Sequence, residues 1–390
     1  MLAVAYGLFF SFSVFLVPLV AEFGWSRGLT AGAMSVSTVV QGLLAPVTGV
    51  FVDRFGPRRV ILVGAVLLSG AFVLGAAIET PWQLYLYTGV VGATGLVGLG
   101  WVPMGVLVSR WFRERRGRAT GITFSGMGVG VFVVGPLAQW LIGAFGWRAA
   151  SALLGAGSLA IVLPIVLLVL RDAPEAARPA PSPHARARLR PGPGDADPTL
   201  GQALGSRTFW ALWFAYLLTP LAVFPVFTHQ VAFAIDQGFA PLVAASVFGL
   251  MGLTSSAGRV GFGLAADRIG APLSATLSFG CTASGALALL ALETWPRAGW
   301  LVLYALLFGA GFGARGPIIT AMASDLFGGR RFGVIYGVLN LANGLGAAIG
   351  PWFGGVVHDA TGSYRVAFLS AVAFSALGAG CFWLARPHTP

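Results

Sequence analysis

Long apolar stretches, separated by short hinges that hold the charged residues, run along most of the chain. A bilayer core about 30 Å thick requires about 20 apolar residues per helix, and twelve stretches reach that length. They lie near residues 1–20, 30–52, 60–78, 83–108, 117–142, 148–170, 208–235, 242–265, 272–291, 299–323, 332–357 and 365–385. The pattern predicts twelve membrane-spanning helices, and the even number places both ends of the chain on one side of the membrane.

The composition excludes a water-soluble globule. Of 390 residues, 57% are hydrophobic and only 9% are charged, whereas about a quarter of a soluble domain is charged. The net charge of +11 comes from arginine, because the chain holds no lysine. The arginines sit in the hinges rather than on one soluble face, which argues against a nucleic-acid partner. We therefore expect an all-α protein embedded in a lipid bilayer.

The arginines also predict the orientation of the chain. Most of them follow every second span, whereas the hinges between hold only Arg27, Arg148, Arg297 and Arg365. Short cytoplasmic loops accumulate arginine, so we expect a multi-pass inner-membrane protein with both termini in the cytoplasm. The first span begins at Met1 without a basic region or a cleavage site, which indicates a spanning helix rather than a cleaved signal. The usual cytoplasmic tail before the first helix is missing, so we expect a shortened N-terminus.

The chain repeats itself on either side of residues 171–207, a segment rich in proline and arginine that cannot build a core. The pattern Gly-x-x-x-Asp-Arg-x-Gly occurs at residues 49–56 and again at 263–270. We expect two pseudo-symmetric six-helix bundles, residues 1–170 and 208–390, joined by a cytoplasmic linker. This arrangement is typical of transporters whose two halves rock about a central site.

We call the two Gly-x-x-x-Asp-Arg-x-Gly segments, residues 49–56 and 263–270, the twin loops. Together with the twelve spans and the central linker, they resemble the major facilitator superfamily over the whole chain. The stretch 111–130, with its pattern Trp-Phe-x-x-Arg-Arg-Gly-x-Ala-x-Gly, is similar to the signature of the monocarboxylate porter and oxalate:formate antiporter families. The stretches 23–27 and 229–238, and Gly-Arg at 258–259, resemble those families too. The acidic motif that animal monocarboxylate porters carry before their first helix is absent.

Two arginines belong to no hinge, and Arg259 is the first. It precedes Asp267 by a distance that corresponds to about 12 Å of helix, so it lies well inside the eighth span. A charge at that depth marks a functional site unless it merely ties helices together. Its guanidinium fork can pair with both oxygens of a carboxylate. The resemblance implies that this arginine binds the substrate carboxylate.

Arg315 is the second buried arginine, about 15 Å of helix before Asp325. It is flanked by Gly313, Gly316 and Pro317, which predicts a break in the tenth span. Unwound backbone at membrane depth is tolerated only where it lines protein or a cavity. Two roles remain open for Arg315: binding of substrate and anchoring of exposed carbonyl groups.

Aromatic and amide side chains complete the candidate substrate site. We expect the first half to supply apolar walls through Tyr6, Phe10, Trp101 and Phe124, although packing is the commoner role of such residues. By the resemblance, Asn343 stands where oxalate:formate antiporters carry a lysine that helps to hold a second carboxylate. The missing charge favours a monocarboxylate, with Asn343 and Asn340 as hydrogen-bond donors.

All the acids lie in or beside hinges, which leaves the substrate itself as one carrier of a coupled proton. His229 and Asp236, which share a face of the seventh span, are the other candidates, with a plain interfacial hydrogen-bonding role as the alternative. The twin loops resemble the superfamily's cytoplasmic gating motif, which implies a conformational lock formed by Asp53, Arg54, Asp267 and Arg268.

Other patterns carry no chemistry. Gly311-x-Gly313-x-x-Gly316 matches the dinucleotide fingerprint but lies inside an apolar span without the strand that the motif requires. Cys281 and Cys381 lie in separate apolar spans, so we expect no disulfide, metal site or cofactor.

These observations predict a monomeric carrier that moves a small monocarboxylate, such as lactate, pyruvate or acetate, by alternating access and with a proton. An anion exchanger of the oxalate:formate type is one alternative. A non-transporting membrane anion sensor is another, although the chain shows no folded soluble domain. We do not expect an enzyme, because no nucleophile, base and orienting acid converge at membrane depth.

Overall fold

The computed structural model describes residues 1–112, 116–170, 199–327 and 332–385. Within these residues the regular structure is entirely helical. Ten helical segments are long and apolar enough to cross a membrane. One of them, Gly121–Val169, is 49 residues long and accommodates two spans, and the shorter helices of the tenth span complete the predicted twelve. The all-α fold with twelve spans is therefore confirmed.

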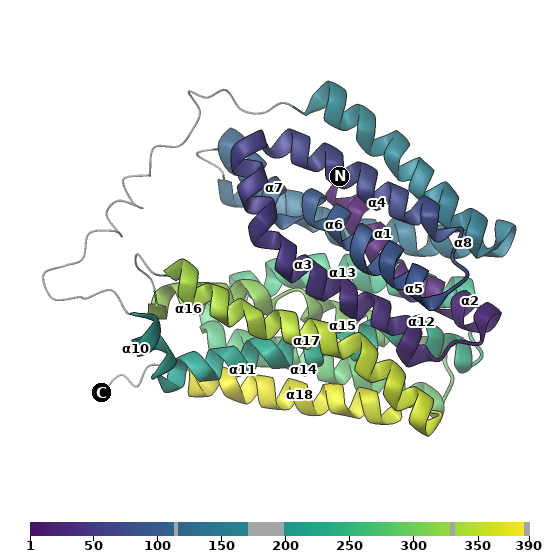
Figure 1. Ribbon diagram of the computed structural model, residues 1–390. Helices are drawn as coiled ribbons and strands as arrows, with labels where there is room; N and C mark the ends of the chain where they lie inside the picture. The colour runs from purple at the N-terminus through teal and green to yellow at the C-terminus, as the bar shows by residue number, and fades with distance from the viewer. Residues whose placement is uncertain (113–115, 171–198, 328–331, 386–390) are drawn as a thin grey trace, which may run out of the picture.

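The helices lie in two groups, which occupy the upper and lower parts of Figure 1. The upper group consists of α1 (Leu2–Phe10), α2 (Phe12–Phe23), α3 (Arg27–Phe55), α4 (Pro57–Gly75), α5 (Pro81–Leu84), a π-helix (Tyr85–Gly92), α6 (Ala93–Leu99), α7 (Trp101–Trp111), α8 (Arg116–Pro164) and a second π-helix (Ile165–Val169). The lower group consists of α10 (Leu200–Leu204), α11 (Arg207–Leu221), α12 (Phe224–Asp236), α13 (Pro241–Ile269), α14 (Ala271–Leu290), α15 (Ala298–Phe312), α16 (Arg315–Phe327), α17 (Phe332–Thr361) and α18 (Arg365–Leu384). We call these groups the first and second halves.

Tight reversals between successive spans depend on glycine. Gly56 links α3 to α4 with φ 82° and ψ 154°, and Gly270 links α13 to α14 with φ 84° and ψ 151°. Gly146 has nearly the same angles, φ 79° and ψ 161°, in the middle of α8. A positive φ is accessible to glycine without steric cost. The apparently continuous helix α8 therefore contains the fifth and sixth predicted spans, which meet at Gly146.

The two ends of the molecule differ in how the halves meet. We call the end where residue 170 leaves the first half and residue 199 enters the second the linker end, and the opposite end the far end (Figure 1). One cluster of buried apolar residues combines the first half with the far-end part of the second. A separate cluster, which includes Phe209, Phe327 and Ile335, belongs to the second half at the linker end. The halves are thus packed together at the far end.

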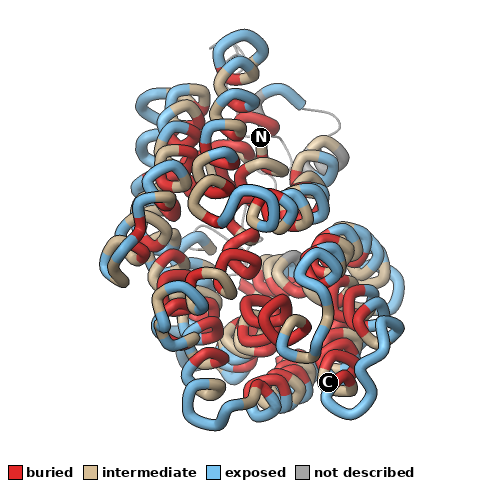
Figure 2. Tube along the Cα trace, turned by 90° about the vertical axis from the view of Figure 1, so that its right-hand side faces the viewer, coloured by how far each residue is buried: buried red, intermediate tan, exposed pale blue. Residues whose placement is uncertain are grey.

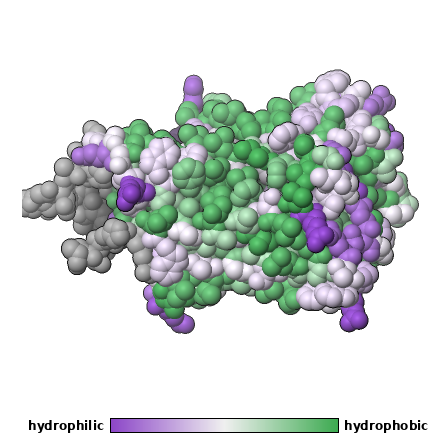
Figure 3. All heavy atoms as spheres, turned by 90° about the horizontal axis from the view of Figure 1, so that it is seen from below, coloured by the Kyte–Doolittle hydropathy of each residue, from purple (hydrophilic) through white to green (hydrophobic). Residues whose placement is uncertain are grey.

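Buried positions concentrate inside each half and where the halves face each other, whereas the outward faces are exposed (Figure 2). Many of the exposed side chains are large and apolar, for example Leu43, Ile122 and Val260. Seen from below, apolar side chains form a broad belt between more polar ends (Figure 3). In water such a surface would be unfavourable, and a lipid bilayer is the solvent that matches it.

The tenth span is broken where the sequence predicts it. Helix α15 ends at Phe312 and α16 begins at Arg315, so Gly313 and Ala314 form a short non-helical step. The seventh span is interrupted as well, because α11 ends at Leu221 and α12 begins at Phe224. Both interruptions lie in the second half, and the step at Gly313 touches the side chain of Arg259.

Candidate functional site

Arg259 of α13 lies against the first half. Its Nη1 donates a hydrogen bond to the carbonyl oxygen of Phe124 in α8, with an N–O distance of 3.2 Å. A methyl group added at Gly313 would lie 3.1 Å from its Nε, so the guanidinium also touches the break in the tenth span. The residue is partly exposed and forms no ion pair with any carboxylate of the described residues. An accessible guanidinium without an acidic partner can receive a carboxylate.

Three of the aromatic candidates lie around this guanidinium. Trp101 stacks on Phe124 with ring centroids 4.2 Å apart, and Cζ of Arg259 lies 6.0 Å from the Trp101 ring centroid. That distance is within the range of cation–π attraction. Tyr6 is buried in α1 and close enough to interact electrostatically with Arg259. The structure therefore places one cation from the second half against three aromatic rings from the first.

Phe10, the fourth aromatic candidate, lies one turn farther along α1 and packs across the halves. Its ring centroid is 5.9 Å from that of Tyr6, 4.8 Å from that of Phe227 and 6.5 Å from that of Phe312. Phe227 and Phe312 stack with centroids 5.2 Å apart. We call Phe10, Phe227 and Phe312 the aromatic plug, because they fill the space on the far-end side of Arg259. Sequence reasoning missed Phe227 and Phe312, since aromatic residues are common in every span.

Among the described residues, no hydrogen bond or ring contact joins the remaining substrate-binding candidates to Arg259. Asn340 is exposed and Asn343 is half-buried on α17, and neither amide has a hydrogen-bond partner in the described part of the chain. Arg315 is fully buried, and its Cζ lies 4.3 Å above the ring centroid of Phe279 in α14. Arg259 approaches the break from α13, whereas Arg315 turns toward α14.

The proton-coupling candidate Asp236 belongs to a polar cluster at the far end. Nη1 and Nη2 of Arg27, at the start of α3, lie 2.5 and 2.9 Å from the two carboxylate oxygens of Asp236 in α12. Nη1 of Arg27 also donates to the hydroxyl oxygen of Tyr364, at 2.8 Å. A bidentate guanidinium–carboxylate pair is a strong and directional contact. It joins the first half to the second.

His229 continues this cluster into the second half. Its Nε2 lies 2.9 Å from the carbonyl oxygen of Pro351, which can only accept a hydrogen bond, so Nε2 carries a proton. Its Nδ1 lies 3.1 Å from the Tyr364 hydroxyl and accepts from it. Burial raises the pKa of the Tyr364 phenol, which keeps that donor protonated. A neutral ring with this tautomer satisfies both nitrogens of the fully buried His229.

Asp359, at the end of α17, ties the same corner together through the backbone. Its two carboxylate oxygens accept hydrogen bonds from the backbone N–H groups of Arg27 and Gly28, at 2.9 and 2.7 Å. A carboxylate at a helix N-terminus is favourable because the first-turn amides lack partners. Sequence reasoning missed Asp359 and Tyr364. The available signal was Arg27 itself, an arginine in a hinge where few arginines occur.

The gating candidates at the linker end, unlike the far-end residues, are not paired with one another in the described part of the chain. These residues are all exposed, and none of them forms an ion pair with another described residue: Asp53, Arg54, Asp267 and Arg268. Among the described residues, the polar contacts between the halves thus lie at the far end and at mid-depth, and none involves the charged residues of the twin loops.

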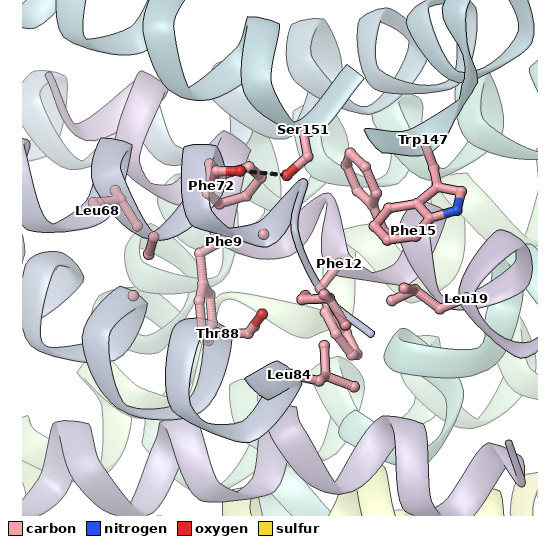
Figure 4. A pocket seen from close by; sticks show the side chains of 14 residues that line it. Phe9, Phe12, Phe15, Leu19, Leu68, Phe72, Leu84, Thr88, Trp147 and Ser151 are labelled. Atoms are coloured by element: carbon pink, nitrogen blue, oxygen red, sulfur yellow. Dashed lines mark hydrogen bonds between the residues drawn. The ribbon is translucent and has the colours of Figure 1, made fainter. Parts of the chain in front are cut away.

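A separate cavity of about 50 Å³ lies inside the first half (Figure 4). Its walls are almost entirely apolar and include Phe9, Phe15 and Trp147. The Ser151 hydroxyl at its rim donates to the carbonyl oxygen of Phe72 at 2.6 Å, so this polar group already has a partner. Apolar cavities of this kind do not bind ions. The cavity does not include Arg259, and it is unsuited to an organic anion.

Comparison with known proteins supports this description. The family model of the Major Facilitator Superfamily matches residues 1–314 and 262–390. Monocarboxylate transporter 13 of Bos taurus is 29% identical over 390 residues, covering 99% of this chain and 87% of its own length. Monocarboxylate transporter 4 of Rattus norvegicus is 30% identical over 362 residues, covering 92% and 75%. Monocarboxylate transporter 11 of Homo sapiens is 29% identical over 384 residues, covering 94% and 76%.

Solved structures show the same fold. Two structures of a bacterial homologue of the human lysosomal transporter Spinster, described as inward-facing and occupied and as inward-facing and unoccupied, each superpose with a TM-score of 0.72. They are 17% and 18% identical, and each comparison covers 98% of this chain and 95% of the other. The chain is a membrane transporter that belongs to the major facilitator superfamily and is homologous to the monocarboxylate transporters.

Proposed function

We propose that the protein moves a small monocarboxylate, such as lactate, pyruvate or acetate, across the cytoplasmic membrane together with a proton. The observation that carries the proposal is Arg259: a partly exposed guanidinium between the halves, without an acidic partner in the described residues. Such a group is costly at membrane depth unless it serves a ligand. The names of the homologous transporters support a monocarboxylate as the ligand.

A single accessible positive charge favours one carboxylate over two. Arg315 has no exposed surface, and Asn343 is uncharged. A dicarboxylate would bring a second negative charge that no described side chain next to Arg259 neutralises, and burying an unpaired charge is strongly unfavourable. Trp101, Phe124 and Tyr6 would contact the short apolar part of the substrate.

The conformation supports alternating access between two rigid halves, residues 1–170 and 208–390. The far end is held by Arg27, Asp236 and Asp359, while the charged residues of the twin loops at the linker end are exposed and form no ion pair with any described residue. With the linker in the cytoplasm, as the arginine distribution predicts, this conformation faces inward. The related Spinster homologue structures are also described as inward-facing.

Asp236 is the residue through which a proton would act. When Asp236 is ionised, it pairs with Arg27 and holds the far end closed. Protonation removes its charge, which weakens the pair and favours opening toward the outside. His229 serves a structural role in this scheme, because both of its ring nitrogens already have partners.

The test is uptake of radioactive lactate into proteoliposomes driven by an inward pH gradient. We expect saturable uptake by the wild-type protein and loss of at least about 90% of it in Arg259→Gln, because a charge-assisted contact of about 1.5–3 kcal/mol disappears. Arg297→Gln is the matched control, since Arg297 is an exposed arginine outside the halves' interface. Wild-type-like saturable uptake by Arg259→Gln would refute the proposal. Uptake that needs a counter-anion inside, and no pH gradient, would indicate exchange instead.

A further inference from the structure

Arg315 is a buried cation that the proposed transport site does not use. It is the first residue of α16, it has 0% exposure, and it is among the largest fully buried side chains. Its Nε, Nη1 and Nη2 all lack hydrogen-bond partners among the described residues. The ring of Phe279, 4.3 Å from its Cζ, offers one cation–π contact. That contact does not satisfy the N–H groups, which normally find acceptors when buried.

No described carboxylate compensates the charge. Arg315 forms no ion pair, and Asp325 on the same helix is exposed and about 15 Å away by helical rise. Cys281 of α14 is the titratable group that interacts with it electrostatically, and a thiol is neutral when protonated. The position of Arg315 adds to the uncompensated positive charge, because the N-terminus of a helix is the positive end of its dipole.

The first turn of α16 is the second feature that favours an anion. The first-turn amides of an α-helix point outward without intrahelical partners and, together with the dipole, attract anions. α16 is 13 residues long, so it develops such an end. Arg315 is the first residue of that turn, so the unpartnered guanidinium starts from the positive end of the helix.

We infer that Arg315 and the first turn of α16 bind one small monovalent inorganic anion, of which chloride is the representative. One negative charge would neutralise the guanidinium and give its N–H groups an acceptor. The transported substrate is a poorer occupant, because it is larger than a halide ion and because Arg315 turns toward α14, away from Arg259. This site is independent of carboxylate transport: it would stabilise the break in the tenth span whichever solute is carried.

The test follows thermal unfolding of the full-length protein in detergent, at constant ionic strength, in sodium chloride, sodium bromide or sodium isethionate. We expect chloride and bromide to raise the melting temperature of the wild-type protein relative to isethionate. In Arg315→Gln the apparent halide affinity should fall by about tenfold or more, since a charge-assisted contact is lost. In isethionate this variant should be at least as stable as the wild type, because it no longer buries an uncompensated charge.

Arg259→Gln is the matched control, and lactate separates the two sites. Arg259→Gln should keep the halide shift and lose stabilisation by lactate, whereas Arg315→Gln should show the reverse. An equal halide shift in the wild type and Arg315→Gln would overturn the proposal. Loss of the lactate shift in Arg315→Gln would overturn it too, by assigning Arg315 to the substrate. If the variant does not fold, radioactive chloride binding to the wild type decides, and absence of saturable binding refutes the site.

Discussion

Arg27 and Asp236 face each other across the two halves, with both Nη atoms of the guanidinium within 2.9 Å of the carboxylate oxygens. Partly exposed pairs of this kind contribute little to the free energy of unfolding. This pair, however, joins two halves that separate at the far end in the proposed transport cycle. We therefore expect its loss to change the balance between conformations more than the stability of the fold.

The first prediction concerns that balance. Arg27→Gln should increase the fraction of molecules open at the far end about two- to fivefold, which corresponds to a pair of up to about 1 kcal/mol. The readout is labelling of Ser13→Cys by a membrane-impermeant maleimide, in protein whose two native cysteines are serine. Ser13 is buried and donates to the carbonyl oxygen of Thr228 across the halves, at 2.9 Å.

Arg148→Gln is the control for this experiment. Arg148 also pairs with a carboxylate, Glu22, but both residues belong to the first half. Its substitution removes an ion pair without releasing the halves. Equal labelling in Arg27→Gln and Arg148→Gln would show that the Arg27–Asp236 pair does not hold the far end closed.

The second prediction concerns the charge of Asp236. Asp236→Asn keeps the size of the side chain but removes the charge that attracts Arg27, so far-end opening should rise about as much as in Arg27→Gln. His229→Gln should raise it less, because His229 contacts Tyr364 and Pro351 but not Asp236. The measurement is the same labelling of Ser13→Cys, at constant pH. A larger increase in His229→Gln than in Asp236→Asn would reverse the assignment.

The third prediction concerns the aromatic plug. Phe10→Ala removes a ring that packs 4.8 Å from Phe227 across the halves. We expect the larger space to admit bulkier monocarboxylates, so the uptake ratio of phenylpyruvate to pyruvate should rise severalfold while Arg259 still binds the carboxylate. Phe145→Ala, at an exposed position of α8, is the control. An unchanged ratio in Phe10→Ala would mean that the plug does not limit substrate size.

The fourth prediction concerns helix packing. A methyl group added at Gly130 in α8 would lie 1.9 Å from the carbonyl oxygen of Ala3, whereas one at Gly121 in the same helix would meet nothing within 4 Å. Gly130→Ala should destabilise the protein by about 1–3 kcal/mol, because backbone must shift to accommodate it. Gly121→Ala should be neutral or slightly stabilising. Equal melting temperatures for the two variants would contradict this packing.

The fold could be predicted because each span carries its own signal. Twenty apolar residues between charged hinges define a spanning helix locally, and Gly313, Gly316 and Pro317 mark the break in the tenth span. Arg259 could be singled out for the same reason, since a charge inside an apolar run is a local anomaly.

The far-end cluster could not be predicted in the same way. Asp236 and Asp359 look like ordinary hinge residues, and their partner Arg27 lies more than 200 positions away in the chain. Only the packing of α17 against both α3 and α12 brings them together. The surroundings of Arg315 were equally hidden, because the direction in which its side chain turns depends on the geometry of the break.

The contact between α3 and α17 closes the far end of the interface between the two halves. A methyl group added at Gly355 would lie 2.5 Å from Cα of Gly28, so the two backbones touch without side chains between them. Such a seam leaves no passage for water or solute. In the transport cycle proposed above, a molecule that dissociates from Arg259 in this conformation would therefore leave by the linker end, until the seam between α3 and α17 parts.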